Sequence, residues 1–409
     1  MSARIELQCL QCGAIEGALE VVACSACGGP LRFAYEPGRT LTDDRFGRGL
    51  WRYWRWLPLG EPCDVVTLGE GGTPLLRSRA YRDRCVWLKD ETRNPTGSHK
   101  DRALAVAINH ARKLGKSVSI VVSAGSTGIS NAAYAARAGM GSITVMAAAT
   151  PDERAYPVFA LGSRLVQVDA PIDDLIDAVE AAGRALGFYV ASTTRRANPH
   201  QAEGPKTIAY EIVETLGRAP DWVVVPTGGG GTVAGLWRGF KDLEAMGVVD
   251  ALPRLAAVVP ADFNAIELAW REAIDDPATY RALDFTGRPP TVLTKLWHLH
   301  PPDGLEAALA VRESGGAVVS VTDEEGSEGA RRIGHGDGLY VEPSSGVAAA
   351  AVDRLIAGGA IAPDEEVVAL LCGSGHRETF VTHMRRPAVA AHCDLAELGA
   401  LLAGMAATT

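Results

Sequence analysis

The sequence has no long apolar run and no excess of positive charge, and each absence argues against a class of protein. No segment of the 409 residues approaches the roughly 20 apolar residues that cross a membrane. The first residues, MSARIELQCLQCG, lack the apolar core of a secretory signal peptide. The net charge of -9 argues against broad nucleic-acid binding, because phosphate backbones are bound by basic surfaces. We therefore expect a cytoplasmic protein that has neither a membrane nor a nucleic acid as its partner.

Cysteine is also sparse, and four of the eight cysteines stand in two C-x-x-C pairs near the N-terminus. Disulfides are rare in the reducing cytoplasm, so such pairs suggest a metal site. Cys9 and Cys12 form one pair and Cys24 and Cys27 the other, and a glycine follows each, as a tight turn requires. Four thiolates suit a closed tetrahedral zinc site. We expect residues 1–35 to form a zinc-ribbon-like module with structural Zn²⁺; a ribbon that has lost its metal is the alternative.

What is present is an alternation of short apolar runs with helical patterns, from about residue 84 onward. Apolar strands separated by helices indicate an α/β fold with parallel sheets, since such strands are buried on both faces. The runs that predict strands are 117–124, 142–147, 164–169, 221–226, 255–260, 339–342 and 366–372.

The segment NPTGSHKDR, residues 94–102, places a lysine at the start of a predicted helix. Ser98 is the expected N-cap, Asp101 completes a pattern like a capping box, and Gly115 suits the position just past the helix end. Lys100 then lies in the first turn, where the positive end of the helix dipole disfavours an ammonium. A lysine that loses its proton easily is a better amine for a Schiff base.

Two turns rich in glycine or hydroxyl groups follow predicted strands. In SAGSTG, residues 123–128, backbone N–H groups at a helix N-terminus could bind a carboxylate, although an ordinary β–α turn is the alternative. In PTGGGGT, residues 226–232, four glycines let the backbone approach a phosphate closely. The second turn is not a Walker P-loop, because no G-K-[ST] follows. A reactive lysine, a turn that can bind a carboxylate and a glycine turn that can bind a phosphate are the minimum that pyridoxal phosphate (PLP) needs to act on a small amino acid.

Segments along nearly the whole chain resemble threonine synthases, within the tryptophan-synthase-β-like (fold type II) family of PLP-dependent enzymes. The similar segments are the cysteine ribbon, WRYWRWLP (51–58), GEGGTPLL (69–76), NPTGSHKDR (94–102), NPHQAEGPKTIAYEI (198–212), PTGGGGT (226–232) and VEPSSGVAAAA (341–351). The resemblance implies two open twisted α/β domains with PLP in the cleft between them, and a homodimer. The large PLP-binding domain would comprise residues 36–99 and 201–390, the small mobile substrate-binding domain 100–200, and a C-terminal helix or tail 391–409.

By this resemblance, Lys100 is the catalytic lysine that carries the cofactor. Ser126 would lie beside the cofactor ring, and Cys372 or Ser374 near the pyridine nitrogen. The residues implied for the cofactor phosphate are Gly228, Gly229, Gly230, Gly231 and Thr232. Those implied for the substrate are Ser123, Ala124, Gly125, Thr127 and Gln201.

Four positions depart from the threonine synthase pattern. His99 stands where the family reads Phe, Ser126 where it reads Asn, and Cys372 where it reads Ser or Thr. The family often reads N-P-x-R-L-E-G, with the arginine on the substrate phosphate, but Gln201 stands here. Gln cannot replace the charged fork of Arg, although Arg195 and Arg196 lie nearby in the sequence.

The leading expectation is a lyase that performs β/γ-elimination and replacement, as threonine synthase converts O-phosphohomoserine and water to threonine and phosphate. The alternative is a specialised relative: a threonine or serine dehydratase, or a β-replacement synthase with another nucleophile. Gln201 and Ser126 favour this alternative. A third interpretation is a non-catalytic zinc-ribbon adaptor whose PLP-binding fold no longer functions. The presence of Lys100 and of the glycine turn at 226–232 argues against it.

Overall fold

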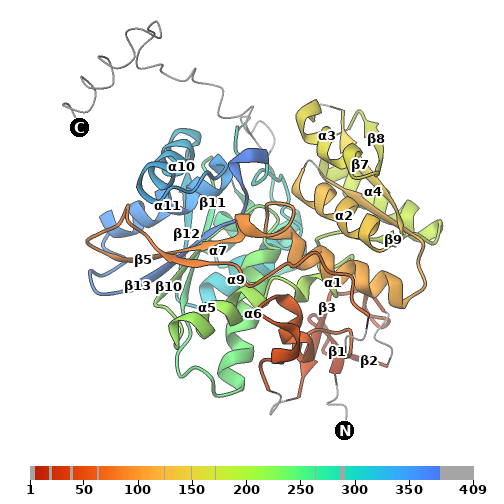
Figure 1. The fold of residues 1–409 in the computed structure, drawn as a ribbon, viewed down its shortest axis with the longest axis horizontal. Helices are drawn as coiled ribbons and strands as arrows, with labels where there is room; N and C mark the ends of the chain where they lie inside the picture. Colours follow the sequence, from red (N-terminus) through yellow and green to blue (C-terminus); the bar gives the residue numbers. More distant parts are fainter. Residues whose placement is uncertain are drawn as a thin grey trace, which may run out of the picture.

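The computed structural model has three β-sheets in separate parts of the molecule (Figure 1). The larger sheet lies at the left of the view, the smaller parallel sheet at the upper right, and the N-terminal sheet below them. The structure describes residues 5–17, 21–36, 40–61, 64–123, 125–148, 150–170, 172–262, 264–285 and 291–377. The predicted tail 391–409, the predicted large domain beyond residue 377, and Ala124 of the predicted carboxylate turn therefore lie outside the described residues.

The N-terminal sheet is antiparallel, in the order β2-β1-β3. Its strands are β1 (Ile5–Cys9), β2 (Ile15–Glu16) and β3 (Leu31–Tyr35). Leu7 and Leu31 are fully buried between the strands and the two cysteine turns. The small antiparallel sheet with its four cysteines is the predicted ribbon.

The larger sheet has the order β12-β11-β10-β13-β5-β4, and its neighbours pair in parallel except β4 with β5. Every residue of β10 and β13 is buried, which explains why both are apolar except for Glu366 at the start of β13. The strands are β4 (Leu75–Arg77), β5 (Cys85–Asp90), β10 (Trp222–Pro226), β11 (Arg254–Pro260), β12 (Ala317–Val321) and β13 (Glu366–Leu371).

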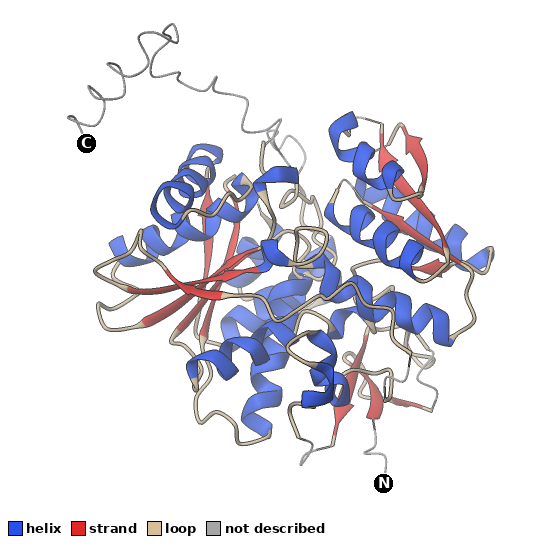
Figure 2. Cartoon of the chain, viewed as in Figure 1, coloured by secondary structure: helices blue, strands red, loops and turns tan. Residues whose placement is uncertain are grey.

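Helices cover both faces of this sheet (Figure 2). Val223 and Val225 of β10 pack into the core on one face with α5, α6 and α9, whereas Trp222 and Val224 pack with α10 and α11 on the other. The helices are α5 (Thr207–Leu216), α6 (Gly231–Ala245), α7 (Ala265–Arg271), α8 (Pro277–Arg281), α9 (Gly304–Glu313), α10 (Asp323–Asp337) and α11 (Pro343–Ala357).

The smaller sheet is parallel, in the order β8-β7-β6-β9. Helices α2 and α3 pack on one face of it and α4 on the other. Its elements are β6 (Val118–Val122), α2 (Ser126–Arg137), β7 (Gly141–Ala147), α3 (Asp152–Ala160), β8 (Arg164–Val168), α4 (Ile172–Ala185) and β9 (Tyr189–Val190). The predicted fold, α/β with two parallel-sheet domains and a ribbon, is confirmed; the predicted domain boundaries stay predictions.

The sequence patterns misplaced some local features. Residues 339–342 form no strand, since Val341 makes only an isolated bridge with Ser374. Helix α1 spans Lys100–Lys113 with His99 as N-cap, so Ser98 does not cap it. Asp101 makes no capping box and accepts hydrogen bonds from Thr96 and Ser130 instead. Lys100 nevertheless begins the helix, as predicted.

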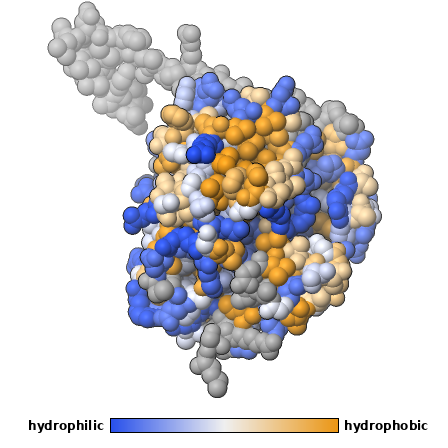
Figure 3. All heavy atoms as spheres, turned by 90° about the vertical axis from the view of Figure 1, so that its right-hand side faces the viewer, coloured by the Kyte–Doolittle hydropathy of each residue, from blue (hydrophilic) through white to orange (hydrophobic). Residues whose placement is uncertain are grey.

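The molecular surface carries exposed apolar side chains on the side of the smaller sheet, which faces the viewer in Figure 3. Tyr156 and Phe159 of α3 and Val166 of the edge strand β8 are all exposed. Among the described residues, no helix combines the length and the apolar character that crossing a membrane requires.

Candidate active site

A cavity of about 420 Å³ opens between the two parallel sheets. Its walls come from the start of α1, the end of β6, the first turns of α2 and α6, and the loop between α8 and α9. Carboxyl ends of parallel strands and helix N-termini meet at this place, which is where α/β folds bind ligands. The cavity brings together most of the residues that the sequence singled out.

Lys100 lines this cavity as the first residue of α1. The surrounding protein lowers its pKa below the usual value, because burial disfavours the ammonium, while nearby Cys372 and Asp303 act in the opposite direction. An amine that gives up its proton easily is the form that attacks a carbonyl carbon.

His99 and Cys372 lie beside Lys100 on the cavity wall. The backbone N–H of His99 donates to the carbonyl of Cys372 at 3.0 Å, and its Nδ1 lies 3.1 Å from the same oxygen. Burial and the neighbouring Lys100 lower the pKa of His99 to about 3, so the ring is neutral. Because a carbonyl only accepts, Nδ1 carries the proton and Nε2 is an acceptor.

The structure places Cys372 and Ser374 differently. Cys372 lines the cavity, and burial raises the pKa of its thiol well above the usual value, so the group is uncharged. Ser374 is not among the described residues that line the cavity, and its Oγ accepts from the backbone N–H of His376. The geometry therefore favours Cys372 over Ser374 as a partner for a ligand in the cavity.

The turn after β6 begins α2 at the cavity wall. Ser123, Gly125, Ser126 and Thr127 all line the cavity. The Oγ of Ser123 accepts from the N–H groups of Gly125 at 3.0 Å and Gly128 at 2.8 Å, so this hydroxyl holds the turn in shape. The first backbone N–H groups of a helix have no intrahelical partner, and such groups are suited to bind an anion.

The glycine turn after β10 is fitted closely against the loop between α8 and α9. A Cβ on Gly228 would lie 2.6 Å from the carbonyl oxygen of Lys295, and one on Gly230, whose φ is +93°, would lie 2.4 Å from that of Asp303. Gly229, Gly230, Gly231 and Thr232 line the cavity, whereas Gly228 backs onto the loop. At least part of the glycine requirement therefore comes from this packing.

Apart from Lys100, the lysine and arginine residues of the described cavity lining were not singled out by the sequence analysis. Gln201 lines the cavity, but the described lining includes neither Arg195 nor Arg196. Arg195 pairs with Glu306 at 3.2 Å and Arg196 with Asp177.

Two lining cations come instead from α3 and from the loop before α9. Arg154 donates to Oγ1 of Thr294 at 2.6 Å, and Lys295 forms an ion pair with Glu342. No local motif marks Arg154 or Lys295, and Lys295 lies far in the sequence from every predicted strand.

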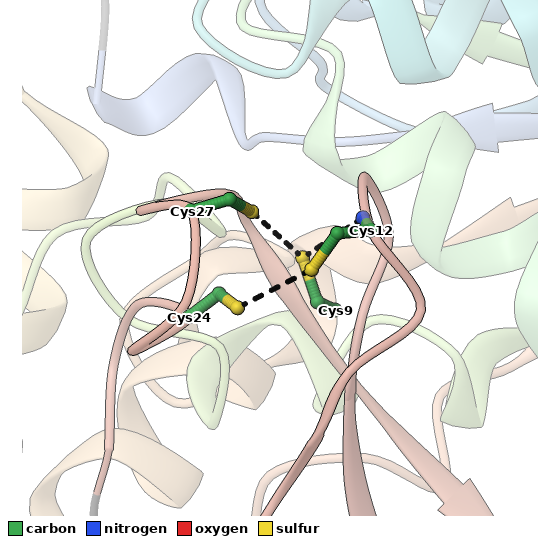
Figure 4. A group of neighbouring side chains, drawn as sticks. All are labelled: Cys9, Cys12, Cys24 and Cys27. Atoms are coloured by element: carbon green, nitrogen blue, oxygen red, sulfur yellow. Dashed lines mark hydrogen bonds between the residues drawn. The ribbon is translucent and has the colours of Figure 1, made fainter.

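The four ribbon cysteines meet at one point (Figure 4) and are not among the described residues that line the cavity. Their Sγ atoms all lie within 4.8 Å of one another, and the pairs Cys9–Cys27 and Cys12–Cys24 are each 3.6 Å apart. Sulfur atoms at about 2.3 Å from a tetrahedral zinc ion would lie at nearly this separation. Backbone N–H groups of Gln11 and Cys12 also point to Sγ of Cys9, which suits a thiolate. This cluster can hold a structural zinc ion.

Comparison with known proteins agrees with this geometry. The chain is 32% identical over 384 residues to threonine synthase of Methanocaldococcus jannaschii, which covers 91% of this chain and 92% of that relative. It is 31% identical over 337 residues to threonine synthase of Mycobacterium leprae, with 81% and 89% covered.

Solved structures share the fold at lower identity. O-ureido-L-serine synthase matches with a TM-score of 0.61 at 22% identity, covering 78% of this chain and 94% of that one. Threonine deaminase isoform 2 of Solanum lycopersicum matches with a TM-score of 0.62 at 20% identity, covering 77% and 88%. The profile of the family described as "Pyridoxal-phosphate dependent enzyme" matches residues 66–373. The chain belongs to this family of PLP-dependent enzymes.

Proposed function

We propose that the protein is a threonine synthase-like lyase that converts O-phosphohomoserine and water to threonine and phosphate. The observation that carries the proposal is one cavity that joins Lys100, the α2 anion turn, the glycine turn and the cations Arg154 and Lys295. A phosphorylated amino acid presents two separate anionic groups, and the cavity offers an N–H turn for one and side-chain cations for the other. Similarity to threonine synthases supports the same reaction.

The residues present fit the cofactor. The cavity volume is of the size that a small ligand of this kind needs. The glycine turn opens the 15-residue helix α6, so backbone N–H groups and the helix dipole favour a phosphate there. Lys100 would hold the cofactor carbonyl carbon, Gly229 to Thr232 its phosphate, and Cys372 its ring nitrogen. PLP, when bound, supplies an electron sink that makes the Cα–H bond of an amino acid acidic.

The chain's own groups then handle binding and proton transfer. The N–H groups of α2 hold the substrate carboxylate, and Lys100 Nζ takes the proton from Cα and returns one later. In the net reaction the Cγ–O bond breaks and phosphate leaves with the electron pair. The hydroxyl of water joins Cβ, the proton displaced from Cβ ends on Cγ, and the second water proton ends on phosphate.

A stopped-flow absorbance experiment with the purified holoenzyme tests this function. O-phosphohomoserine, threonine, serine and O-acetylserine are each mixed with the enzyme, and released phosphate, threonine and keto acid are measured. We expect only O-phosphohomoserine to give a fast spectral change with equal amounts of phosphate and threonine. If it is inert while serine or threonine yields a keto acid, the protein is a dehydratase; turnover of O-acetylserine with an added nucleophile would make it a β-replacement synthase. The neutral Gln201 at the cavity wall favours these alternatives.

Replacing Gln201 with arginine is expected to improve use of O-phosphohomoserine about tenfold in kcat/KM, as one charge-assisted hydrogen bond to phosphate would. Gln201 is buried and lines the cavity, and its backbone N–H is held by Asn198, so the new guanidinium would begin from a fixed position. Steady-state kinetics with O-phosphohomoserine measure the effect, and the dissociation constant of unphosphorylated threonine serves as the comparison.

The matched comparison is Arg154→Gln, which should lower kcat/KM for O-phosphohomoserine and leave the dissociation constant of threonine little changed. Equal effects on O-phosphohomoserine and on threonine, or no gain for Gln201→Arg, would contradict a phosphate role for this wall of the cavity. We also propose that the enzyme works as a cytoplasmic homodimer and that the ribbon holds zinc structurally.

A further inference from the structure

An acidic side chain, that of Asp303, packs against the glycine turn that we assign to the cofactor phosphate. Oδ2 of Asp303 is 2.8 Å from the position that a Cβ on Gly231 would occupy, and Asp303 itself lines the cavity. The loop is fixed there by the backbone, since the N–H of Asp303 donates to the carbonyl of Gly229 at 2.8 Å. An acidic side chain is the opposite of what a phosphate site usually presents, because two anions repel.

The contacts of Asp303 do not give it an ordinary capping role. It precedes α9, yet its side chain makes no capping hydrogen bond to that helix within the described part of the chain. Its carboxylate accepts from the backbone N–H of Arg195, at 3.0 Å to Oδ1 and 3.3 Å to Oδ2. A neutral asparagine would accept that bond equally well, so the acidity of this position is not needed for the fold.

The charged groups around Asp303 are three cations and one anion, and they come from three segments. Lys100 faces it from α1, Arg195 and Arg196 from the segment before η4 (Gln201–Glu203), and Glu306 from α9. Arg195 is itself paired with Glu306. Burial and Glu306 raise the pKa of Asp303 to about 7, against the opposing effect of Arg195 and Lys100.

We propose that Asp303 binds the cofactor phosphate in its protonated form, as a hydrogen-bond donor, so that the cofactor and one proton bind together. The inference rests on the assignment of the glycine turn to the cofactor phosphate made above. A carboxylic acid donates one O–H and no longer repels the phosphate, whereas the carboxylate can only accept. The proton comes from solvent and stays on the Asp303–phosphate pair until the cofactor leaves.

The proposal fixes the direction of a pH effect. Below about pH 7 Asp303 is already protonated before the phosphate binds, so binding requires no uptake of a proton. Above that pH the free carboxylate must take up a proton when the phosphate binds, so the dissociation constant rises by up to about tenfold per pH unit. Formation of the bond to Lys100 has the opposite dependence, because a lysine must lose its proton to react.

Pyridoxamine phosphate separates the two effects, because it carries the same phosphate but has no aldehyde to react with Lys100. Its binding to the full-length chain, freed of cofactor, is measured by tryptophan fluorescence at pH 6.5, 7.5 and 8.5; Trp297 lines the cavity and can report it. We expect the dissociation constant of pyridoxamine phosphate from the wild-type chain to rise about tenfold per pH unit above pH 7. Asp303→Asn should show a much smaller dependence and bind tighter than wild type at pH 8.5.

Glu306→Gln provides a second variant that leaves Asp303 in place. Removal of the neighbouring negative charge lowers the pKa of Asp303. The dissociation constant of pyridoxamine phosphate should therefore begin to rise at a lower pH than in wild type. Parallel pH dependences in wild type and both variants would overturn the role of Asp303 while the cofactor site stands. Failure of the wild-type chain to bind pyridoxamine phosphate or PLP at any pH would overturn the cofactor site itself.

Discussion

Replacing Lys100 with alanine is expected to abolish the visible Schiff-base absorbance and to reduce turnover by on the order of 10³-fold or more, as loss of the proton-transfer group alone would. Lys100 is the first residue of α1 and lines the cavity, and its lowered pKa suits a reactive amine. Alanine is the best helix former, so α1 should still begin at this residue. The absorbance spectrum after addition of PLP, together with turnover of the accepted substrate, measures the result.

Two other lysines serve as controls for this variant. Lys113 ends the same helix and is exposed, so Lys113→Ala should keep both absorbance and turnover. Lys295 also lines the cavity but forms an ion pair with Glu342, and Lys295→Ala should keep the absorbance. If Lys295→Ala loses the absorbance while Lys100→Ala keeps it, the cofactor is carried by Lys295 and the assignment of Lys100 is wrong. Thermal unfolding of each variant shows whether the fold survives.

The sequence predicted those parts of the site that depend on local geometry. Lys100 follows from its position at a helix start, and the glycine turn from four glycines between a buried strand and a helix. Each of these signals lies within about ten consecutive residues, so no knowledge of the tertiary fold was needed.

The rest of the site depends on chain segments that meet only in the folded protein. Arg154 comes from α3, and Lys295 and Asp303 from an irregular loop that carries no recognisable pattern. The same limit explains the error at residues 339–342, where an apolar run packs beside Ser374 without pairing as a strand. Ser98 was predicted as an N-cap because Asp101 completed the pattern of a capping box. The sequence could not show that the Asp101 carboxylate accepts hydrogen bonds from Thr96 and Ser130 instead.

Arg102, two residues after Lys100, has a structural role that the sequence alone did not show. Arg102 is fully buried, donating from Nε to Glu91 at 2.7 Å and from Nη1 to Glu211 at 2.7 Å. Lys89 Nζ lies 2.6 Å from the same Glu211. Burial alone would raise the pKa of Glu211, but Arg102 and Lys89 outweigh it and lower that pKa to about 2. Two cations and two anions therefore form a closed ionic cluster that joins α1 to α5 and to η3 (Glu91–Arg93).

Replacing Arg102 with methionine should destabilise the protein by about 3–5 kcal/mol, because one partner of a buried ionic cluster is removed. Glu91 and Glu211 would remain buried with only Lys89 to balance them, and water cannot reach them, since both are almost fully enclosed. Urea unfolding followed by circular dichroism measures the loss of stability.

Arg112→Met on the same helix is the matched control. Arg112 pairs with the exposed Asp64, and removing this pair should cost at most about 1 kcal/mol. Equal losses in the two variants would show that the cluster adds no more than a surface ion pair. A larger loss for Arg102→Met would show that the residue two positions after Lys100 anchors the helix that begins at Lys100.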